Sequence, residues 1–153
     1  MMSRTQRAQV LSALLLVCTL VECGYGDGRS ADYGLKSTPQ LSDLEGKTWV
    51  AHEIVDPDRQ LVSGSSLTMT FSADSLSANA GCNTLHGAAS VQDDELVASQ
   101  LASTMMACEE DLMAQDTWLS DFLTSKPTIE HSDDDLWLSQ GDTVIHLVAE
   151  EEE

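Results

Sequence analysis

Ala80-Gly81-Cys82-Asn83 and Thr104-Met105-Met106-Ala107-Cys108 are the two segments that decide how this chain folds. They hold the last two of its four cysteines, and the other two lie within the first 23 residues. In an exported protein, a pair of this kind is a candidate disulfide. The residues alone leave two alternatives open, which are two buried free thiols and a metal-binding or catalytic pair.

A Cys82–Cys108 bond would join a turn between strands to the start of a helix. A closed loop of about 27 residues contributes roughly 3–4 kcal/mol of stability in the chain-entropy model. A nucleophilic Cys82 with His86 as its base is the less favoured interpretation, because no Lys or Arg lies nearby to lower the thiol pKa. We therefore expect no catalytic residue, with a thiol, redox or hydrolytic activity of Cys82 and Cys108 as the alternative.

The residues before and between these segments predict strands. Thr48–Val55 is rich in β-forming residues, and apolar and polar residues alternate in Leu67–Phe71. Ser75–Ala89 contains Gly81 and Gly87, so its strands should be interrupted or bulged. Glu95–Ser99 is a further short strand candidate.

A helical period follows over Cys108–Ser125. Its apolar stripe is Cys108, Leu112, Leu119, Phe122 and Leu123, and Gln115 interrupts it. Thr128–His131 then predicts a strand, and Leu136–Leu138 with Thr143–Ala149 predicts a hairpin. This order predicts an α+β fold with a mainly antiparallel sheet and one packed helix.

The first 22 residues have the pattern of a signal peptide. Arg4 and Arg7 precede the apolar run Val10–Val21, which is too short for a standard membrane-spanning helix. Cys23 then resembles the lipidated cysteine of a bacterial lipobox, although Glu22 departs from the small residue expected there. Plain secretion and a buried N-terminal helix are the alternatives. Residues 23–40, rich in Gly, Ser and Asp, predict a flexible stalk.

The charge of the chain limits its partners. Seven basic and 26 acidic residues give a net charge of −19. A phosphate backbone would be repelled, so we expect no nucleic-acid partner. The same charge argues against docking on an anionic membrane through the protein surface. Residues 150–153 predict a solvated acidic tail rather than a metal site.

The remaining candidates favour structural roles. His52, His131 and His146 lack the spacing of metal ligands, and Asp133–Asp135 lacks the alternating ligands of a calcium loop. Met105, Met106 and Met113 are expected to be flexible core filler near the helix, with copper binding as the alternative. We expect no metal and no cofactor.

Four blocks of the sequence resemble the META domain, the family of the heat-shock protein HslJ. They are Leu44-Glu45-Gly46-Lys47-Thr48-Trp49, the stretch from Leu67 to Gly87 with Gly81-Cys82-Asn83, Thr104–Cys108, and Leu136–Leu147. The resemblance covers nearly all of residues 41–149 and implies a barrel-like sheet with one packed helix. It also implies that Gly46, Trp49, Gly81, Asn83, Gly87 and Thr104 are structural residues.

The resemblance implies a small domain of exported or lipid-anchored bacterial proteins. We therefore expect a non-enzymatic module of the cell envelope, held on the membrane by a lipid on Cys23 or secreted, with a role in stress tolerance. Its partner would be an unidentified envelope protein or ligand. An acidic inhibitor of a basic envelope hydrolase is a further alternative, because the surface carries so much negative charge.

Overall fold

The computed structural model describes residues 35–150. The predicted signal peptide, the proposed anchor Cys23, most of the predicted stalk and the last three residues of the tail lie outside this range. The elements are a 3-10 helix, η1 (Leu41–Leu44), the helix α1 (Glu110–Thr124), and the strands β1 (Thr48–Val55), β2 (Thr68–Ser72), β3 (Ser75–Asn79), β4 (Thr84–Gln92), β5 (Glu95–Ser103), β6 (Thr128–Ser132), β7 (Asp135–Gln140) and β8 (Thr143–Glu150).

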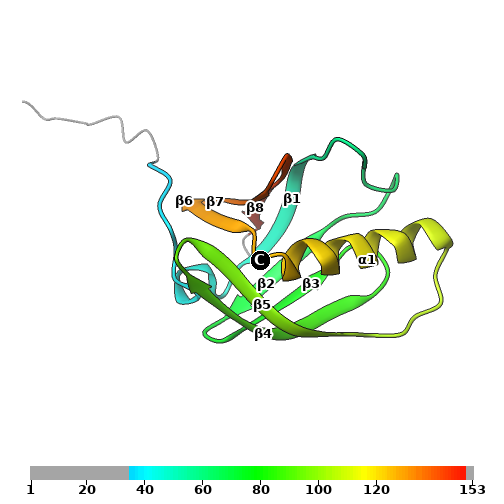
Figure 1. The fold of residues 1–153 in the computed structure, drawn as a ribbon, viewed down its shortest axis with the longest axis horizontal. Helices are drawn as coiled ribbons and strands as arrows, with labels where there is room; N and C mark the ends of the chain where they lie inside the picture. Colours follow the sequence, from blue (N-terminus) through cyan, green and yellow to red (C-terminus); the bar gives the residue numbers. More distant parts are fainter. Residues whose placement is uncertain (1–34, 151–153) are drawn as a thin grey trace, which may run out of the picture. The chain divides into compact units, whose positions relative to one another are not determined.

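The eight strands form a ring in which each strand pairs antiparallel with the next and β8 returns to β1 (Figure 1). The ring is not a regular barrel, since β5 and β6 share a single register pair, Glu95 with Thr128. The helix α1 connects these two strands and packs against β5. This confirms the predicted α+β fold with an antiparallel barrel-like sheet and one helix.

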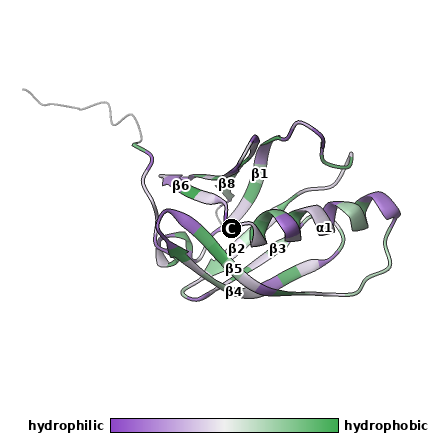
Figure 2. Cartoon of the chain, viewed as in Figure 1, coloured by the Kyte–Doolittle hydropathy of each residue, from purple (hydrophilic) through white to green (hydrophobic). Residues whose placement is uncertain are grey.

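The core follows from the alternation of apolar side chains along the strands. Leu67, Met69 and Phe71 point inward, as the period of two predicts. From α1, Leu119, Phe122 and Leu123 enter the same cluster, and the helix shows hydrophobic and hydrophilic stretches in turn (Figure 2). The side chains that meet inside the ring therefore come from both the sheet and the helix.

Trp49 is the largest fully buried side chain. Its indole Nε1 donates a hydrogen bond to the carbonyl of Leu44, 3.1 Å away, at the end of η1. Leu41 and Leu44 are themselves buried in the core cluster. A buried indole usually finds a partner for its N–H, and here that partner places η1 against the ring.

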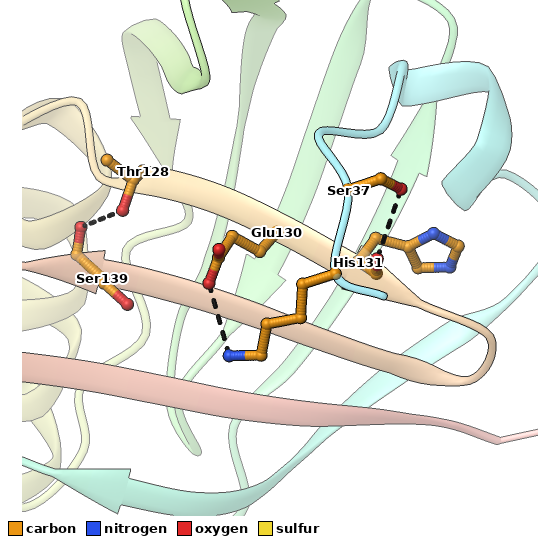
Figure 3. A network of polar contacts seen from close by, with 6 residues as sticks. Ser37, Thr128, Glu130, His131 and Ser139 are labelled. Atoms are coloured by element: carbon orange, nitrogen blue, oxygen red, sulfur yellow. Dashed lines mark hydrogen bonds and ion pairs between the residues drawn. The ribbon is translucent and has the colours of Figure 1, made fainter. Parts of the chain in front are cut away.

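Lys36 and Ser37, near the end of the predicted stalk, lie against β6. Ser37 and His131 exchange two backbone hydrogen bonds of 2.9 and 2.8 Å, which form an antiparallel bridge. The Ser37 hydroxyl also points to the His131 carbonyl, 3.5 Å away (Figure 3). The Lys36 ammonium forms a 3.3 Å ion pair with Glu130 and lies 4.0 Å from the centre of the Trp137 ring. These contacts hold the last residues of the segment, which therefore do not form a free linker.

Several predicted boundaries differ from the structure. The helix begins at Glu110 rather than Cys108, and β5 continues to Ser103 rather than Ser99. The segment Ser75–Ala89 forms two strands, and the register shifts between His86 and Ala88, which confirms the predicted interruption and bulge. The extra residue of the bulge lies on β5, where Gln100 and Leu101 face the single residue Gly87. An added Cβ at Gly87 would be 2.9 Å from a Leu101 methyl and 3.1 Å from the Ser99 carbonyl.

The prediction that the methionines fill the core is wrong. Met105 is 98% exposed, Met106 61% and Met113 47%. The loop from β5 to α1 runs over the surface, so its two adjacent methionines, Met105 and Met106, are not buried. Met113 belongs to the outer side of α1, away from the apolar stripe.

Candidate functional site

Cys82 and Cys108 are joined by a disulfide, with their Cα atoms 6.2 Å apart. The bond connects the turn between β3 and β4 to the residue two positions before α1. This confirms the predicted pairing and sets aside the free-thiol and metal-binding alternatives for the oxidised chain. Both sulfur-bearing residues are partly exposed, so the bond lies near the surface.

Asn83 connects three segments of the chain through one side chain. Its Oδ1 accepts hydrogen bonds from the Met106 amide at 2.7 Å and the Thr104 hydroxyl at 2.9 Å. Its Nδ2 donates to Asp116 Oδ2 at 2.9 Å, and its own amide donates to the same oxygen at 2.8 Å. The predicted motif therefore holds the β5–α1 loop and the helix together beside the disulfide.

Thr104 extends the pairing of β4 with β5. Its hydroxyl accepts a 3.0 Å hydrogen bond from the Thr84 amide, and its amide donates to the Thr84 carbonyl at 3.1 Å. A hydroxyl can accept one hydrogen bond while donating another, as Thr104 does here between Thr84 and Asn83.

A side chain does not fit at position 81. The φ of Gly81 is +109°, and an added Cβ would lie 2.9 Å from the Ser65 Cβ and 3.2 Å from a Leu112 methyl. Gly46 also has a positive φ, +72°, in the turn before β1. Both are conformations that glycine adopts at low cost.

The sequence interpretation missed the role of Gln115. The residue is only 1% exposed, and its side chain is the polar centre of the contact between α1 and the rest of the domain. Its Oε1 accepts from the Val62 amide at 2.7 Å, and its Nε2 donates to the Ser65 hydroxyl at 2.9 Å and to the Ala80 carbonyl. The sequence signal for this role was that Gln115 interrupts the apolar stripe of the helix.

Asp116, the next residue, was also missed. It is 6% exposed, and its Oδ2 receives both hydrogen bonds from Asn83. Its other carboxylate oxygen, Oδ1, is buried and has no hydrogen-bond partner among the described residues. Buried carboxylate oxygens are normally satisfied, so Oδ1 of Asp116 is an exception within residues 35–150.

A groove of about 530 Å³ lies between α1 and the turn that joins β7 to β8. Trp118 lies in it, with its ring stacked on Phe122 at a centroid distance of 6.0 Å. The Trp118 indole donates to Asp56 Oδ2 at 3.3 Å, and the Thr143 hydroxyl donates to the same oxygen at 2.8 Å. The ring is thus held in one orientation at the side of the groove.

These contacts determine the charge state of Asp56. Partial burial raises the pKa of its carboxyl, but hydrogen bonds from the Asp58 amide, Thr143 and Trp118 outweigh that effect. The pKa of Asp56 therefore lies below its ordinary value. Asp56 is a fixed carboxylate that orients the groove wall.

A smaller pocket of about 250 Å³ lies on the other side of α1. It lies between the helix and the paired ends of β4 and β5, and Asp116 is among its lining residues. Thr117 and Asp121 line both this pocket and the groove. The outer face of α1 therefore separates two concave surfaces.

His52, His131 and His146 contact aromatic rings or one another. His146 bonds Asp135 Oδ1 at 2.5 Å and stacks on Trp137, with His52 edge-on at 5.6 Å. His131 lies in β6 beside Trp49, at a ring distance of 5.7 Å. Within residues 35–150 no three potential ligand side chains gather as a metal site would require. The same residues contain no helix with the length and apolarity to cross a membrane.

Comparison with solved structures shows the same fold in other proteins. A protein from Burkholderia xenovorans, solved by NMR, is 21% identical, with a TM-score of 0.57, and the match covers 72% of this chain and 86% of that one. A second NMR structure is 20% identical, with a TM-score of 0.57, over 71% of this chain and 92% of the other. A crystal structure of a DUF4847 family protein from Bacteroides vulgatus is 12% identical, with a TM-score of 0.50, over 73% and 98% of the two chains. At these identities the likeness concerns the fold alone.

A search of curated proteins found no significant match. The model of the META domain family matches residues 42–152, which is most of the chain and includes Asn83 and both bonded cysteines. By that match, this chain belongs to the META domain family.

Proposed function

We propose that this META domain is a non-enzymatic binding module of the cell envelope, exported and held on the membrane by a lipid on Cys23. Its partner would be an envelope protein or ligand. The segment of Arg4, Arg7 and Val10–Val21 in front of Cys23 supports export. The observation that carries the proposal is the bond between Cys82 and Cys108. Disulfides persist in oxidising compartments and are rare in the cytosol.

The groove beside Trp118 is the proposed binding surface. A mostly preformed concave site with an aromatic wall and a few polar groups is the usual form of a ligand site. Trp118 is already oriented by Asp56 and Phe122, so it loses little freedom when a partner covers it. The motif residues Gly81, Asn83 and Thr104 hold the backbone and bind no partner in this proposal.

Intact-mass measurement of the protein from its native host tests export and anchoring together. We expect cleavage before Cys23, the mass of a diacylglycerol group on that residue, and two hydrogens fewer than the reduced Cys82–Cys108 pair. Cleavage without added lipid would support secretion instead of anchoring. An unprocessed chain with free thiols would contradict export.

The role of the groove in stress tolerance has its own test. A deletion strain is examined for sensitivity to envelope stress and then complemented with the wild type, Trp118→Ala or Trp137→Ala. Trp137 lies on β7 outside the groove and provides a matched loss of an indole. We expect Trp118→Ala alone to fail in complementation at equal protein level, and a deletion with no phenotype would contradict the stress role.

A thiol-based activity is the second candidate, because the disulfide is partly exposed. Its measurement is the redox state of the Cys82–Cys108 pair in cells. A pair that stays oxidised under mild reductant supports the structural role, whereas a fraction that exchanges with thiol reagents supports redox chemistry. Capture of a basic hydrolase that persists at high salt would favour the inhibitor alternative.

A further inference from the structure

The pocket between α1 and the β4–β5 pair has an entirely acidic and neutral lining. Its two carboxylates belong to Asp116 and Asp121, and its hydroxyls belong to Ser103, Thr117 and Ser120. Asn83, Leu85, Leu101 and Met113 complete the lining, with no Lys or Arg. A pocket of this composition attracts cations and repels anions.

Asp116 gives this pocket a buried hydrogen-bond acceptor that has no donor among the described residues. The residue is 94% buried, since only 6% of its surface is exposed, and Asn83 satisfies only its Oδ2. Oδ1 is buried without a partner in the described part of the chain. A buried carboxylate oxygen that lacks a hydrogen bond costs free energy, and a charged donor recovers the most.

We propose that this pocket binds a primary alkylammonium group, with Asp116 Oδ1 as the central acceptor. An –NH₃⁺ group has three donors and no acceptor. One donor meets Asp116, another meets the hydroxyl of Ser120 one turn further along α1, and the exposed carboxylate of Asp121 attracts the cation from the mouth of the pocket. The alkyl chain then lies along Met113 and Leu101. A polyamine or the side chain of a lysine in another protein presents this same group.

Other cations fit the lining less well. A calcium ion takes six to eight oxygen ligands, whereas this pocket offers two carboxylates, and no cluster of three candidate ligand residues occurs within residues 35–150. A quaternary ammonium has no N–H to donate to Oδ1. The hydrogen-bonding requirement of Asp116 therefore selects a primary amine.

Entry requires a small movement, because Oδ1 exposes less than 1 Å². Met113 lines the pocket and is 47% exposed. Its unbranched thioether side chain changes rotamer easily, so it is suited to make room for the ligand. The methyl group of Met113 should therefore report the binding of a ligand in this pocket.

The inference extends the proposed function by adding a ligand class on the second side of α1, and it rests on that function only for its biological setting. Amine binding is measured on purified protein and does not depend on export or on the lipid. A failure here leaves the mass measurement and the Trp118 experiment unaffected.

The experiment follows methionine methyl resonances by NMR in processed protein labelled with ¹³C-methyl methionine. The probes are n-butylammonium chloride, spermidine and a lysine peptide with blocked ends, with tetramethylammonium chloride at matched ionic strength as the control. We expect saturable movement of the Met113 methyl with each primary amine, and none at Met105, which is 98% exposed on the loop. A stronger response to spermidine favours a polyamine, and a stronger response to the peptide favours a lysine side chain.

The variants are Asp116→Asn, Asp121→Asn and, as a matched loss of charge on α1 outside the pocket, Glu110→Gln. Asp116→Asn should weaken binding by about tenfold or more, and Asp121→Asn by about two- to fivefold because its carboxylate is exposed. Glu110→Gln should bind as the wild type does. Thermal unfolding of each variant identifies any loss of folding, and Asp121→Asn on the surface keeps the test valid if Asp116→Asn unfolds.

Three results would overturn the proposal. The first is an equal response to tetramethylammonium, which would mean ionic screening alone. The second is equal weakening by Glu110→Gln and Asp121→Asn. The third is no response of Met113 to millimolar amine, which would leave a buried water as the partner of Oδ1.

Discussion

Asn83 uses its side chain and its amide to satisfy groups from two other segments. The Met106 amide and the Thr104 hydroxyl donate to it, and it donates twice to Asp116. Each of these groups would otherwise be a polar atom near the interior without a partner. An amide side chain is suited to this position because it is both donor and acceptor.

Replacement of Asn83 by Ala should lower the free energy of unfolding by about 2–4 kcal/mol, because it leaves Asp116 and the Met106 amide unsatisfied. Urea unfolding measures the change. Gln92→Ala is the matched control, since Gln92 is exposed and its side chain contacts only the Ser90 hydroxyl. Equal stability of the two variants would show that the Asn83 contacts are not important for folding.

The depressed pKa of Asp56 makes a specific prediction about pH. A carboxyl whose folded-state pKa lies below its unfolded value adds stability above the unfolded pKa. That contribution disappears as the pH falls from 3.8 through the lower folded-state value. Asp56→Asn should therefore be less stable than the wild type at neutral pH, and the difference should shrink below this range. Unfolding measured from pH 7 to pH 2 checks this, and a difference that is constant with pH would contradict it.

At the scale of elements, α1 is held by polar contacts as much as by its apolar stripe. Gln115 reaches the β1–β2 loop at Val62 and Ser65 and the β3–β4 turn at Ala80. The helix bears no basic residue in its last turn and relies on tertiary packing for stability.

Gln115→Leu should therefore destabilise the domain by about 1–3 kcal/mol, although it completes the apolar stripe, because the Val62 amide and Ala80 carbonyl lose their partner. Hydrogen exchange should show faster exchange at the Val62 amide. Thr124→Leu, an equally apolar change at the exposed end of α1, is the control. A more stable Gln115→Leu protein would show that the stripe outweighs the hydrogen bonds.

The disulfide connects the β3–β4 turn to the loop before α1, beyond the last residue pair of β4 with β5. Cys82→Ser with Cys108→Ser should lower the stability by about 3–4 kcal/mol on the chain-entropy model. Denaturant unfolding of the double variant, compared with the oxidised and the reduced wild type, measures this. The reduced wild type should resemble the double variant, and a loss of stability in the double variant alone would indicate strain caused by serine.

At the scale of the whole molecule, negative charge dominates. The chain carries 26 acidic and 7 basic residues. Within the described range, lysines form two ion pairs, Lys36 with Glu130 and Lys47 with Asp134. The repulsion among the carboxylates should therefore exceed the attraction within these ion pairs, so screening by salt should stabilise the fold.

Added NaCl should raise the melting temperature of the domain by a few degrees between about 10 mM and 500 mM, because the Debye length falls from about 30 Å toward a few ångströms. Thermal unfolding monitored by circular dichroism measures it. A melting temperature that falls with salt would mean that the lysine ion pairs outweigh the repulsion.

Most of the strands were predictable because each depends on a local pattern. The alternation in Leu67–Phe71 and the β-forming residues of Thr48–Val55 correspond to β2 and β1. Met105 and Met106 could not be placed in the same way, since an apolar residue near a helix has no periodic signal that distinguishes core from surface. Gln115 and Asp116 were missed because a polar residue at a buried position is recognised only through its partners, which lie far away in the sequence.

Residue type and spacing were sufficient to predict the antiparallel sheet with one helix, to favour a Cys82–Cys108 disulfide over its alternatives, and to indicate the META domain family. The concave surface on each side of α1 and the unpartnered buried oxygen of Asp116 emerge only in the folded domain. Hydrogen-bond satisfaction depends on every neighbour in space, and Asp116 meets Asn83 and the ends of β4 and β5 only when α1 packs against this part of the sheet.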